Sequence, residues 1–301
     1  MRGLTDYITE CDWIDVFTVW FVLVDDTFNL LYRHLRLRPS GPVPTFTDSE
    51  VITISLISDT YFHGNEELAL AFIRQHYLAL FPNLLSNSRF NRRRRALSAC
   101  MEGVRRALRD ALIDPQDSLR LTDSAPIPVC TYQRGYQCQT VSGAEYCSVM
   151  PSRKAKLFGF HLDLTVTLEQ VVDAWMLAPA APRDGKMAEP LLEDAANLLV
   201  CGDNAFRDPG VAARLKAKRG ITLLAPPRLH YDTIQWPAEF RKLFNRVRRR
   251  VESALSVLCI VFQVEQPGSR SLSGLVARIA TRILAYTISF FASAILQPEK
   301  N

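Results

Sequence analysis

The chain has 301 residues, of which 48% are hydrophobic and 22% are charged. This composition excludes an intrinsically disordered chain and leaves enough apolar mass for one large core or two smaller ones. The formal net charge of +5 is too small to indicate a partner by itself, so the distribution of the charges decides more than their sum.

Cysteine usage and hydropathy favour a cytoplasmic protein without a membrane span. The seven cysteines are scattered and form no CxxC pair, which is typical of reduced thiols. Cys130, Cys138 and Cys147 have spacings that match no common zinc-ligand pattern. The N-terminus lacks the features of a signal peptide. The apolar run 283–296 is shorter than the roughly 20 residues of a membrane span and predicts a buried core helix.

The N-terminal part of the chain, residues 1–115, is predicted to be an all-helical domain. The proline- and glycine-rich segment 39–44 breaks the chain after the first helix. Thr47 and Glu50 have the spacing of a capping box ahead of an apolar run, which marks the start of the second helix. The expected helices cover residues 13–32, 48–62, 66–80 and 88–112.

Basic residues are concentrated in two short stretches. Residues 89–109 carry eight arginines against the single acid Glu102, and residues 241–250 carry six basic residues and no acid. Guanidinium groups bind phosphate oxygens in pairs, so these stretches favour a polyanion as partner. Short helices joined by tight turns also suggest a helix-turn-helix-like unit. Two alternatives stay open: the basic stretches are solvated helix faces, or the helices form a bundle without a DNA role.

After about residue 118 the pattern changes to mixed α/β. Short apolar segments rich in Val, Leu, Phe and Thr predict strands over 119–129, 157–167, 170–177, 197–203 and 221–225. Helical spacing or helix-start signals predict helices over 186–197, from Asp208 onward, over 238–262 and over 271–296. Residues 116–297 are therefore predicted to form an α/β domain with a mixed sheet flanked by helices, compatible with an RNase H-like core.

Three acids occupy positions that suggest chemistry. Asp123 lies inside the first strand, Asp203 ends a later strand, and Glu252 lies on a helix. Acids at the ends of apolar strands cost desolvation energy unless something compensates them, and divalent cations would do so. Each acid also has a structural alternative: a turn cap for Asp123 and Asp203, and an i, i+4 pair with Arg248 for Glu252.

The sequence resembles bacterial insertion-sequence transposases of the DDE type, which have an RNase H-like catalytic domain. The branch it resembles places Asp-Ser-x-Pro-x-x-Val-Cys around its first catalytic acid, as found here from Asp123 to Cys130. The resemblance covers most of the chain from residue 46 to residue 290. Its further motifs are 46–51, 88–93, 156–162, Gly202-Asp203, 248–252 and 272–286.

The resemblance implies a catalytic, metal-binding triad of Asp123, Asp203 and Glu252 that holds two Mg²⁺ or Mn²⁺ ions. The implied reaction is metal-dependent cleavage at the ends of an insertion sequence, followed by strand transfer into target DNA. The implied partner is double-stranded DNA, both element ends and target, bound by a homodimer in a synaptic complex. Candidate DNA contacts are Arg92, Arg93, Arg94, Arg95, Lys156, His161, Arg248 and Arg249, although a histidine in an apolar strand is more often half-buried and satisfied.

Several positions depart from the pattern of these transposases. Asn204 and Phe206 replace a basic and a phenolic residue after Asp203, and Asn245 and Cys259 stand where tyrosine and lysine are common. Two other functions therefore stay open: a catalytically decayed, transposase-derived DNA-binding protein, and a metal-dependent DNA nuclease of the same fold. A serine hydrolase and a nucleotide-binding protein have no support, because GxSxG, GxGxxG and P-loop motifs are missing.

Overall fold

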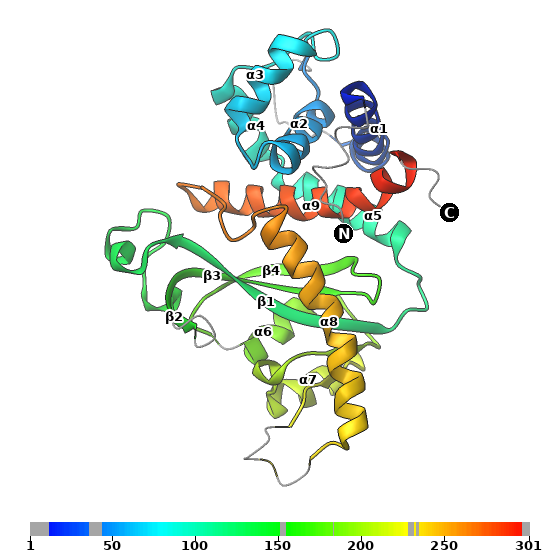
Figure 1. The fold of residues 1–301 in the computed structure, drawn as a ribbon, viewed down its shortest axis with the longest axis vertical. Coiled ribbons are helices and arrows are strands. Elements are labelled where there is room, and N and C mark those ends of the chain that lie inside the picture. The colour runs from blue at the N-terminus through cyan, green and yellow to red at the C-terminus, as the bar shows by residue number, and fades with distance from the viewer. Residues whose placement is uncertain are drawn as a thin grey trace. The chain divides into compact units, whose positions relative to one another are not determined.

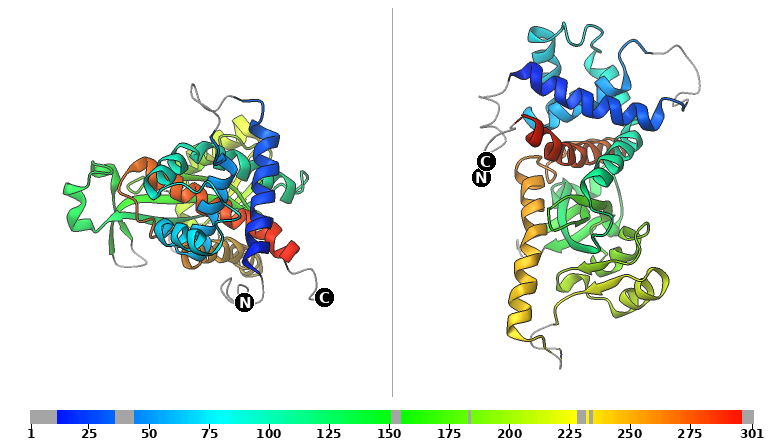
Figure 2. Two further views of the ribbon diagram at one scale, coloured as in Figure 1. Left: turned by 90° about the horizontal axis from the view of Figure 1, so that it is seen from above. Right: turned by 90° about the vertical axis from the view of Figure 1, so that its right-hand side faces the viewer.

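The chain consists of two compact units. The computed structural model describes residues 12–35, 44–150, 155–182, 184–227, 232 and 235–296, so most of the expected break at 39–44 lies outside the described residues. One unit comprises residues 1–111 together with 260–301, and the other comprises residues 112–259. Figures 1 and 2 draw the helices and strands of both units.

The first unit is built from helices (Figure 1). The helices predicted over 13–32, 48–62 and 271–296 are confirmed, whereas the helix predicted over 88–112 is two helices that part at Leu97. In the described part of this unit the helices are α1 (Trp13–Tyr32), α2 (Asp48–Tyr61), α3 (Glu66–His76), α4 (Asn87–Ala96), α5 (Ser98–Leu112) and α9 (Leu272–Leu296).

Helix α2 is buried on all sides from Val51 to Thr60. Its start has the predicted capping box, in which the N–H of Glu50 donates to the Thr47 hydroxyl at 3.1 Å and the N–H of Thr47 donates to the Glu50 carboxylate. The hydroxyl of Thr60 donates to the carbonyl of Leu56 at 2.8 Å. Ser55 makes the same kind of bond to Val51, whereas the hydroxyl groups of Thr53 and Ser58 are buried without a hydrogen-bond partner among the described residues.

Helix α9 is long and apolar enough to cross a membrane, but 61% of its most apolar window is buried inside the protein. This burial is typical of a core helix in a soluble protein, as predicted for the run 283–296. Helices α1, α2 and α4 contact it. The sequence analysis placed residues 116–297 in one domain, whereas the contacts group α9 with the N-terminal helices, because a helix that is apolar on nearly every side needs partners around it.

The second unit contains a mixed sheet flanked by helices, which confirms the predicted α/β class. The strands follow the order β2-β3-β1-β5-β6, and β4 pairs with β3 beside β2. Strand β3 is antiparallel to β1, β2 and β4, whereas β5 runs parallel to both β1 and β6. The strands are β1 (Leu119–Cys130), β2 (Cys147–Met150), β3 (Ala155–Val166), β4 (Val172–Pro179), β5 (Leu199–Cys201) and β6 (Thr222–Leu224).

Helices α6 (Asp184–Leu191), α7 (Pro209–Arg219) and α8 (Ala238–Ile260) complete this unit. A buried cluster built around Val200, Phe206 and Leu215 joins α6, α7 and β5. Helix α7 begins with the predicted cap, since the Asp208 side chain accepts the N–H of Val211 at 3.0 Å. The helix predicted over 186–197 ends early at Leu191, one residue after Pro190, which lies within its last turn.

Candidate active site

The parallel pairing of β1 and β5 brings two acids to the same level of the sheet. Leu121 of β1 lies opposite Cys201 of β5. Asp123 lies two residues further along β1, and Asp203 lies two residues after Cys201, just beyond the end of β5. Neighbouring strands in a sheet are about 4.8 Å apart, so this register makes the two carboxylates neighbours. An electrostatic interaction between Asp123 and Asp203 agrees with that placement.

Gly202 lets the chain pass close to β1 just before Asp203. A Cβ atom at this position would lie 2.8 Å from the Cβ of Phe206 and 3.0 Å from the Cγ2 of Thr122. The Asp203 carboxylate accepts the N–H of Ala205 at 2.7 Å, so the structural alternative of a turn cap is realised. That bond uses Oδ1, and Oδ2 accepts no hydrogen bond from any residue that the structure describes.

Helix α8 adds the third acid and an arginine. One guanidinium nitrogen of Arg248, Nη2, lies 3.4 Å from Asp123 Oδ2 and 3.9 Å from Glu252 Oε1. The two carboxylate oxygens are therefore no further apart than the sum of those distances. The i, i+4 pair expected as the structural alternative for Glu252 is present, and the same arginine links Glu252 to Asp123. Glu252 is 55% exposed, whereas Asp123 is 21% exposed.

Burial raises the pKa of Asp123 from 3.8 to about 6. The N–H of Ser124, which donates to its Oδ1 at 2.9 Å, and the charge of Arg248 lower this pKa, but the charges of Asp203 and Glu252 raise it. Asp123 is thus a half-buried acid whose negative charge is disfavoured by its surroundings. A raised pKa of this origin, together with converging charged groups, is typical of a functional site.

The three acids do not form a finished metal site as they stand. Among the described residues, no three histidine, cysteine, aspartate or glutamate side chains are close enough to hold one ion. Arg248 instead supplies the positive charge between Asp123 and Glu252. The donors nevertheless suit a hard divalent cation, because they are carboxylate oxygens, and Asp203 Oδ2 has no hydrogen-bond partner among the described residues.

Substituting Asp123 by asparagine is expected to stabilise the protein at neutral pH. The folded-state pKa of Asp123 lies above the unfolded-state value, so the folded state binds more protons and stability falls as the pH rises from about 4 to about 6. Asp123→Asn removes this loss of stability. For a pKa raised from 3.8 to about 6, the loss amounts to roughly 3 kcal/mol in the free energy of unfolding. Urea unfolding should show a more stable variant at pH 7.5 and little difference at pH 4.

The matched control is Glu193→Gln, which removes an exposed carboxylate from the same unit. Its free energy of unfolding should follow that of the wild type at both pH values. Equal stability of Asp123→Asn and wild type at pH 7.5 would mean that the Asp123 carboxylate is not strained in the folded protein.

Comparison with known proteins assigns neither a family nor a function to the chain. No protein family, no curated protein and no solved structure matches the chain.

The structure does not bring Lys156 and His161 to the acids. Lys156 lies eight residues before Leu164, the partner of Asp123 on β3, which corresponds to roughly 25 Å along the strand. Its ammonium group lies over the ring of Tyr132, 5.1 Å from the ring centre. His161 pairs with Pro126, whose side chain points to the face opposite Asp123 because side chains alternate along a strand. The prediction that these residues contact DNA beside the cut has no support from their positions.

The predicted arginines differ in their surroundings. Arg249 is exposed on α8, beside the half-buried Arg248. Of the run on α4, Arg92 and Arg95 are exposed, and Arg93 donates to Asp48 at 2.5 Å. Arg94 is 1% exposed and ion-paired with Asp59 and Glu66. Arg94 is therefore a core residue. Its burial does not agree with the prediction that it contacts DNA.

The sequence analysis missed the roles of two residues near Asp203. Asn204 was noted only as a departure from the transposase pattern, yet its amide oxygen is buried without a hydrogen-bond partner. Phe206 was noted as the loss of a phenolic group, but its ring is fully buried in the core beside Val200. The apolar neighbours of Phe206 could have indicated its burial. Nothing in the sequence distinguishes the Asn204 amide from an ordinary turn residue.

Proposed function

We propose that the protein is a DNA transposase that cleaves the ends of an insertion sequence and joins them to target DNA. The observation that carries this proposal is the placement of Asp123 next to Asp203 by the β1–β5 register, with Arg248 of α8 in contact with both Asp123 and Glu252. Phosphoryl transfer on DNA needs carboxylates in such an arrangement to hold divalent cations beside the scissile phosphate.

The strand order supports an RNase H-like sheet. Apart from β2, the sheet runs β4-β3-β1-β5-β6, with three antiparallel strands followed by two strands that are parallel to β1. The resemblance to DDE transposases implies an RNase H-like domain, and a mixed sheet of this order supports it. The first acid lies on the central strand β1, the second just beyond the neighbouring strand β5, and the third on α8.

Asp123, Asp203 and Glu252 are the residues that would hold Mg²⁺ or Mn²⁺. The cations would supply activation of the attacking oxygen and stabilisation of the leaving oxygen. In this proposal the three carboxylates would hold the cations, whose positive charge would position the reacting phosphate. Because the pKa of Asp123 is about 6, its carboxylate is mostly ionised and ready to bind a cation at pH 7.5.

Arg248 has the features of a counterion that can exchange partners. Its distances of 3.4 and 3.9 Å to the acids exceed the roughly 2.8 Å of a strong charged hydrogen bond, and its buried Nε has no hydrogen-bond partner. We infer that Arg248 neutralises Asp123 and Glu252 without metal and contacts a DNA phosphate when cations bind. The exposed Arg249 would contact phosphate beside it.

The test is a cleavage and joining assay with the full chain. A supercoiled plasmid carries a marker between the DNA segments that flank the gene, and is incubated with a second plasmid in Mg²⁺, in Mn²⁺ or in EDTA. We expect excised marker and joined products with either metal and neither product in EDTA. These products would be detected by sequencing across the junctions.

Other outcomes would favour the alternatives. Metal-dependent cuts without joined products would indicate a nuclease of the same fold. DNA binding that is indifferent to metal, with no cleavage at all, would indicate a decayed transposase that only binds DNA. Either result would contradict the proposed transposase activity.

A further inference from the structure

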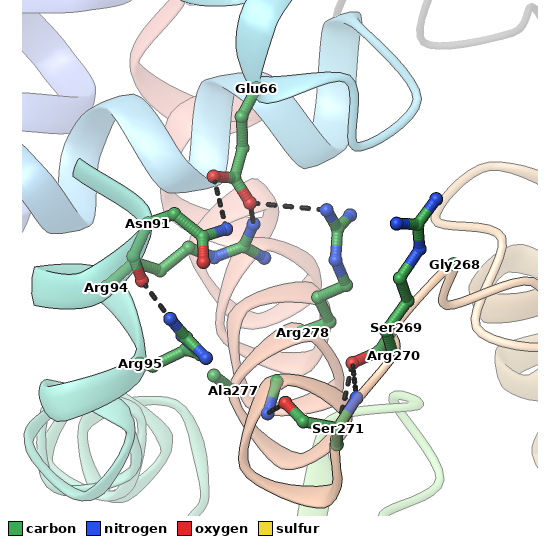
Figure 3. A pocket seen from close by; sticks show the side chains of 11 residues that line it. Glu66, Asn91, Arg94, Arg95, Gly268, Ser269, Arg270, Ser271, Ala277 and Arg278 are labelled. Carbon is green, nitrogen blue, oxygen red and sulfur yellow. Dashed lines mark hydrogen bonds and ion pairs between the residues drawn. The ribbon is translucent and has the colours of Figure 1, made fainter. Parts of the chain in front are cut away.

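A polar cavity lies in the helical unit. Its volume is about 240 Å³, and it is enclosed by the start of α3, by α4, by the loop 268–271 and by the start of α9. Four arginines line it, against the single carboxylate of Glu66. Figure 3 shows Arg94 and Arg95 reaching it from α4 on one side, and Arg270 and Arg278 from the loop and α9 on the other.

The inner wall of this cavity has more positive than negative charge. Glu66 Oε1 accepts from Nη1 of Arg94 and from Nη2 of Arg278, the latter at 3.3 Å. Behind it, Asp59 pairs with Arg94 at 2.7 Å and with Arg282 at 3.6 Å. Three guanidinium groups therefore share two carboxylates. The Nε of Arg94, which lines the cavity, is buried without a hydrogen-bond partner.

The titration of the buried arginines agrees with this excess of positive charge. Burial is the largest effect that lowers the pKa of Arg278, and the nearby Arg94 lowers it further. The pKa of Arg282 is lowered by burial and by the charges of Arg278 and Arg94, while Asp59 raises it. Uncompensated guanidinium groups in a partly enclosed space favour an anion as their additional partner.

Two exposed arginines at the rim of the cavity can donate further hydrogen bonds. Arg270 is exposed and makes no hydrogen bond or ion pair with any residue that the structure describes. Arg95 is exposed, and within the described part of the chain its one hydrogen bond is from Nε to the carbonyl of Asn91 at 3.4 Å. The loop also leads into the N-terminus of α9, a helix of 25 residues. The positive end of the helix dipole adds to the positive electrostatic potential of the cavity.

Close packing holds this loop in place. The Ser271 hydroxyl accepts the N–H of Gly274 at 3.2 Å, which ties the loop to the first turn of α9. A Cβ atom at Gly274 would lie 2.6 Å from the hydroxyl oxygen of Ser269. Arg278 is fixed from the other side, since its Nη1 donates to the carbonyl of Gly64 at 2.9 Å. The arginines around the cavity are thus presented by fixed backbone.

We propose that this cavity is a phosphate-binding site, in which Arg95, Arg270 and Arg278 bind the oxygens of one phosphate group of a DNA backbone. Guanidinium groups match phosphate oxygens in geometry and charge, and two arginines with free donors reach the opening from opposite sides. The site itself follows from the cavity. Only the choice of DNA as the source of the phosphate rests on the proposed function.

The experiment uses the full chain and a charge-matched pair of variants. Arg95→Gln/Arg270→Gln removes the two exposed arginines of the cavity, and Arg74→Gln/Arg106→Gln removes two exposed arginines of the same unit that do not line it. Two quantities are measured: the shift of the thermal midpoint by inorganic phosphate against NaCl of equal ionic strength, and the affinity for a short duplex over a series of salt concentrations.

We expect phosphate to raise the midpoint of the wild type and of the control, but not that of the cavity variant. The slope of log affinity against log salt should fall by about 1 in the cavity variant relative to the control, as for one lost phosphate contact. Equal phosphate responses of the two variants would overturn the site. A phosphate response that depends on the cavity, with an unchanged slope for DNA, would assign the site to a small phosphate compound and overturn the DNA assignment.

The proposed catalytic function and the proposed phosphate site can be tested independently of each other. The phosphate response is measured without DNA and without divalent metal, so it does not depend on cleavage. If no DNA is cleaved by the wild type but the cavity variant alone loses its phosphate response, the phosphate site stands and the transposase proposal does not.

Discussion

The Asp123→Asn variant is expected to lose metal-dependent DNA cleavage by about a thousandfold or more, because removal of a metal-binding carboxylate forfeits several kcal/mol of transition-state stabilisation. Asp203→Asn and Glu252→Gln should have comparable effects, since each removes one charge from the same site. Cleavage of the plasmid substrate in Mg²⁺ and in Mn²⁺ measures the three losses.

The same variants provide the control for this result. Asp123→Asn should be more stable than the wild type at pH 7.5, so its loss of cleavage cannot be attributed to unfolding. Its affinity for DNA at fixed salt should stay within a factor of a few of the wild-type affinity. Cleavage at an undiminished rate by Asp123→Asn would remove the basis for treating these acids as catalytic.

Replacing Arg94 by alanine is expected to destabilise the protein by roughly 3–5 kcal/mol, the usual cost of breaking a buried ion pair from one side. The Arg94 side chain is 1% exposed and that of Asp59 is completely buried. Without Arg94, the one ion-pair partner of Asp59 left among the described residues is Arg282, at 3.6 Å. Urea unfolding of the variant and the wild type at pH 7.5 would measure the difference.

The neighbouring residue supplies the control. Arg92→Ala removes an exposed arginine from the same helix and should change the free energy of unfolding by no more than about 0.5 kcal/mol. The two variants carry the same change of charge, so a difference between them isolates burial. Equal unfolding midpoints would contradict the view that Arg94 is a core residue.

Local sequence signals predicted the elements of the fold well, and tertiary contacts account for the differences. The Thr47 capping box and the Asp208 cap depend on neighbours three residues away, and both are present. The grouping of α9 with the N-terminal helices depends on contacts with helices more than 150 residues earlier in the chain. Hydrophobic periodicity indicates that a helix is buried, but it does not indicate which elements the helix packs against.

Within the arginine run, periodicity contained a signal that the sequence analysis did not use. Phe90, Arg94, Leu97 and Met101 follow at intervals of four, three and four residues, which places Arg94 on the apolar face of its helix. The partner acid Asp59, 35 residues earlier, could not have been assigned to it from spacing.

For the candidate site, the sequence predicted which acids to examine but not their surroundings. Their positions in or at the end of apolar strands indicated Asp123 and Asp203, and the i, i+4 spacing predicted the pair of Arg248 with Glu252. The reach of Arg248 to Asp123 spans 125 residues of sequence, and the burial that raises the pKa of Asp123 depends on the packed unit. Both follow from tertiary structure, which a single sequence does not supply.

The first unit is assembled from both ends of the chain, and this has a consequence for synthesis on the ribosome. Asp59 and Glu66 emerge early, whereas Arg278 and Arg282 emerge more than 200 residues later. The unit of residues 112–259 is contiguous and can fold while the last helix is still inside the ribosome. A chain released before α9 would leave two core carboxylates short of their cations, so truncated products are predicted to be removed by proteases rather than to accumulate as DNA-binding fragments.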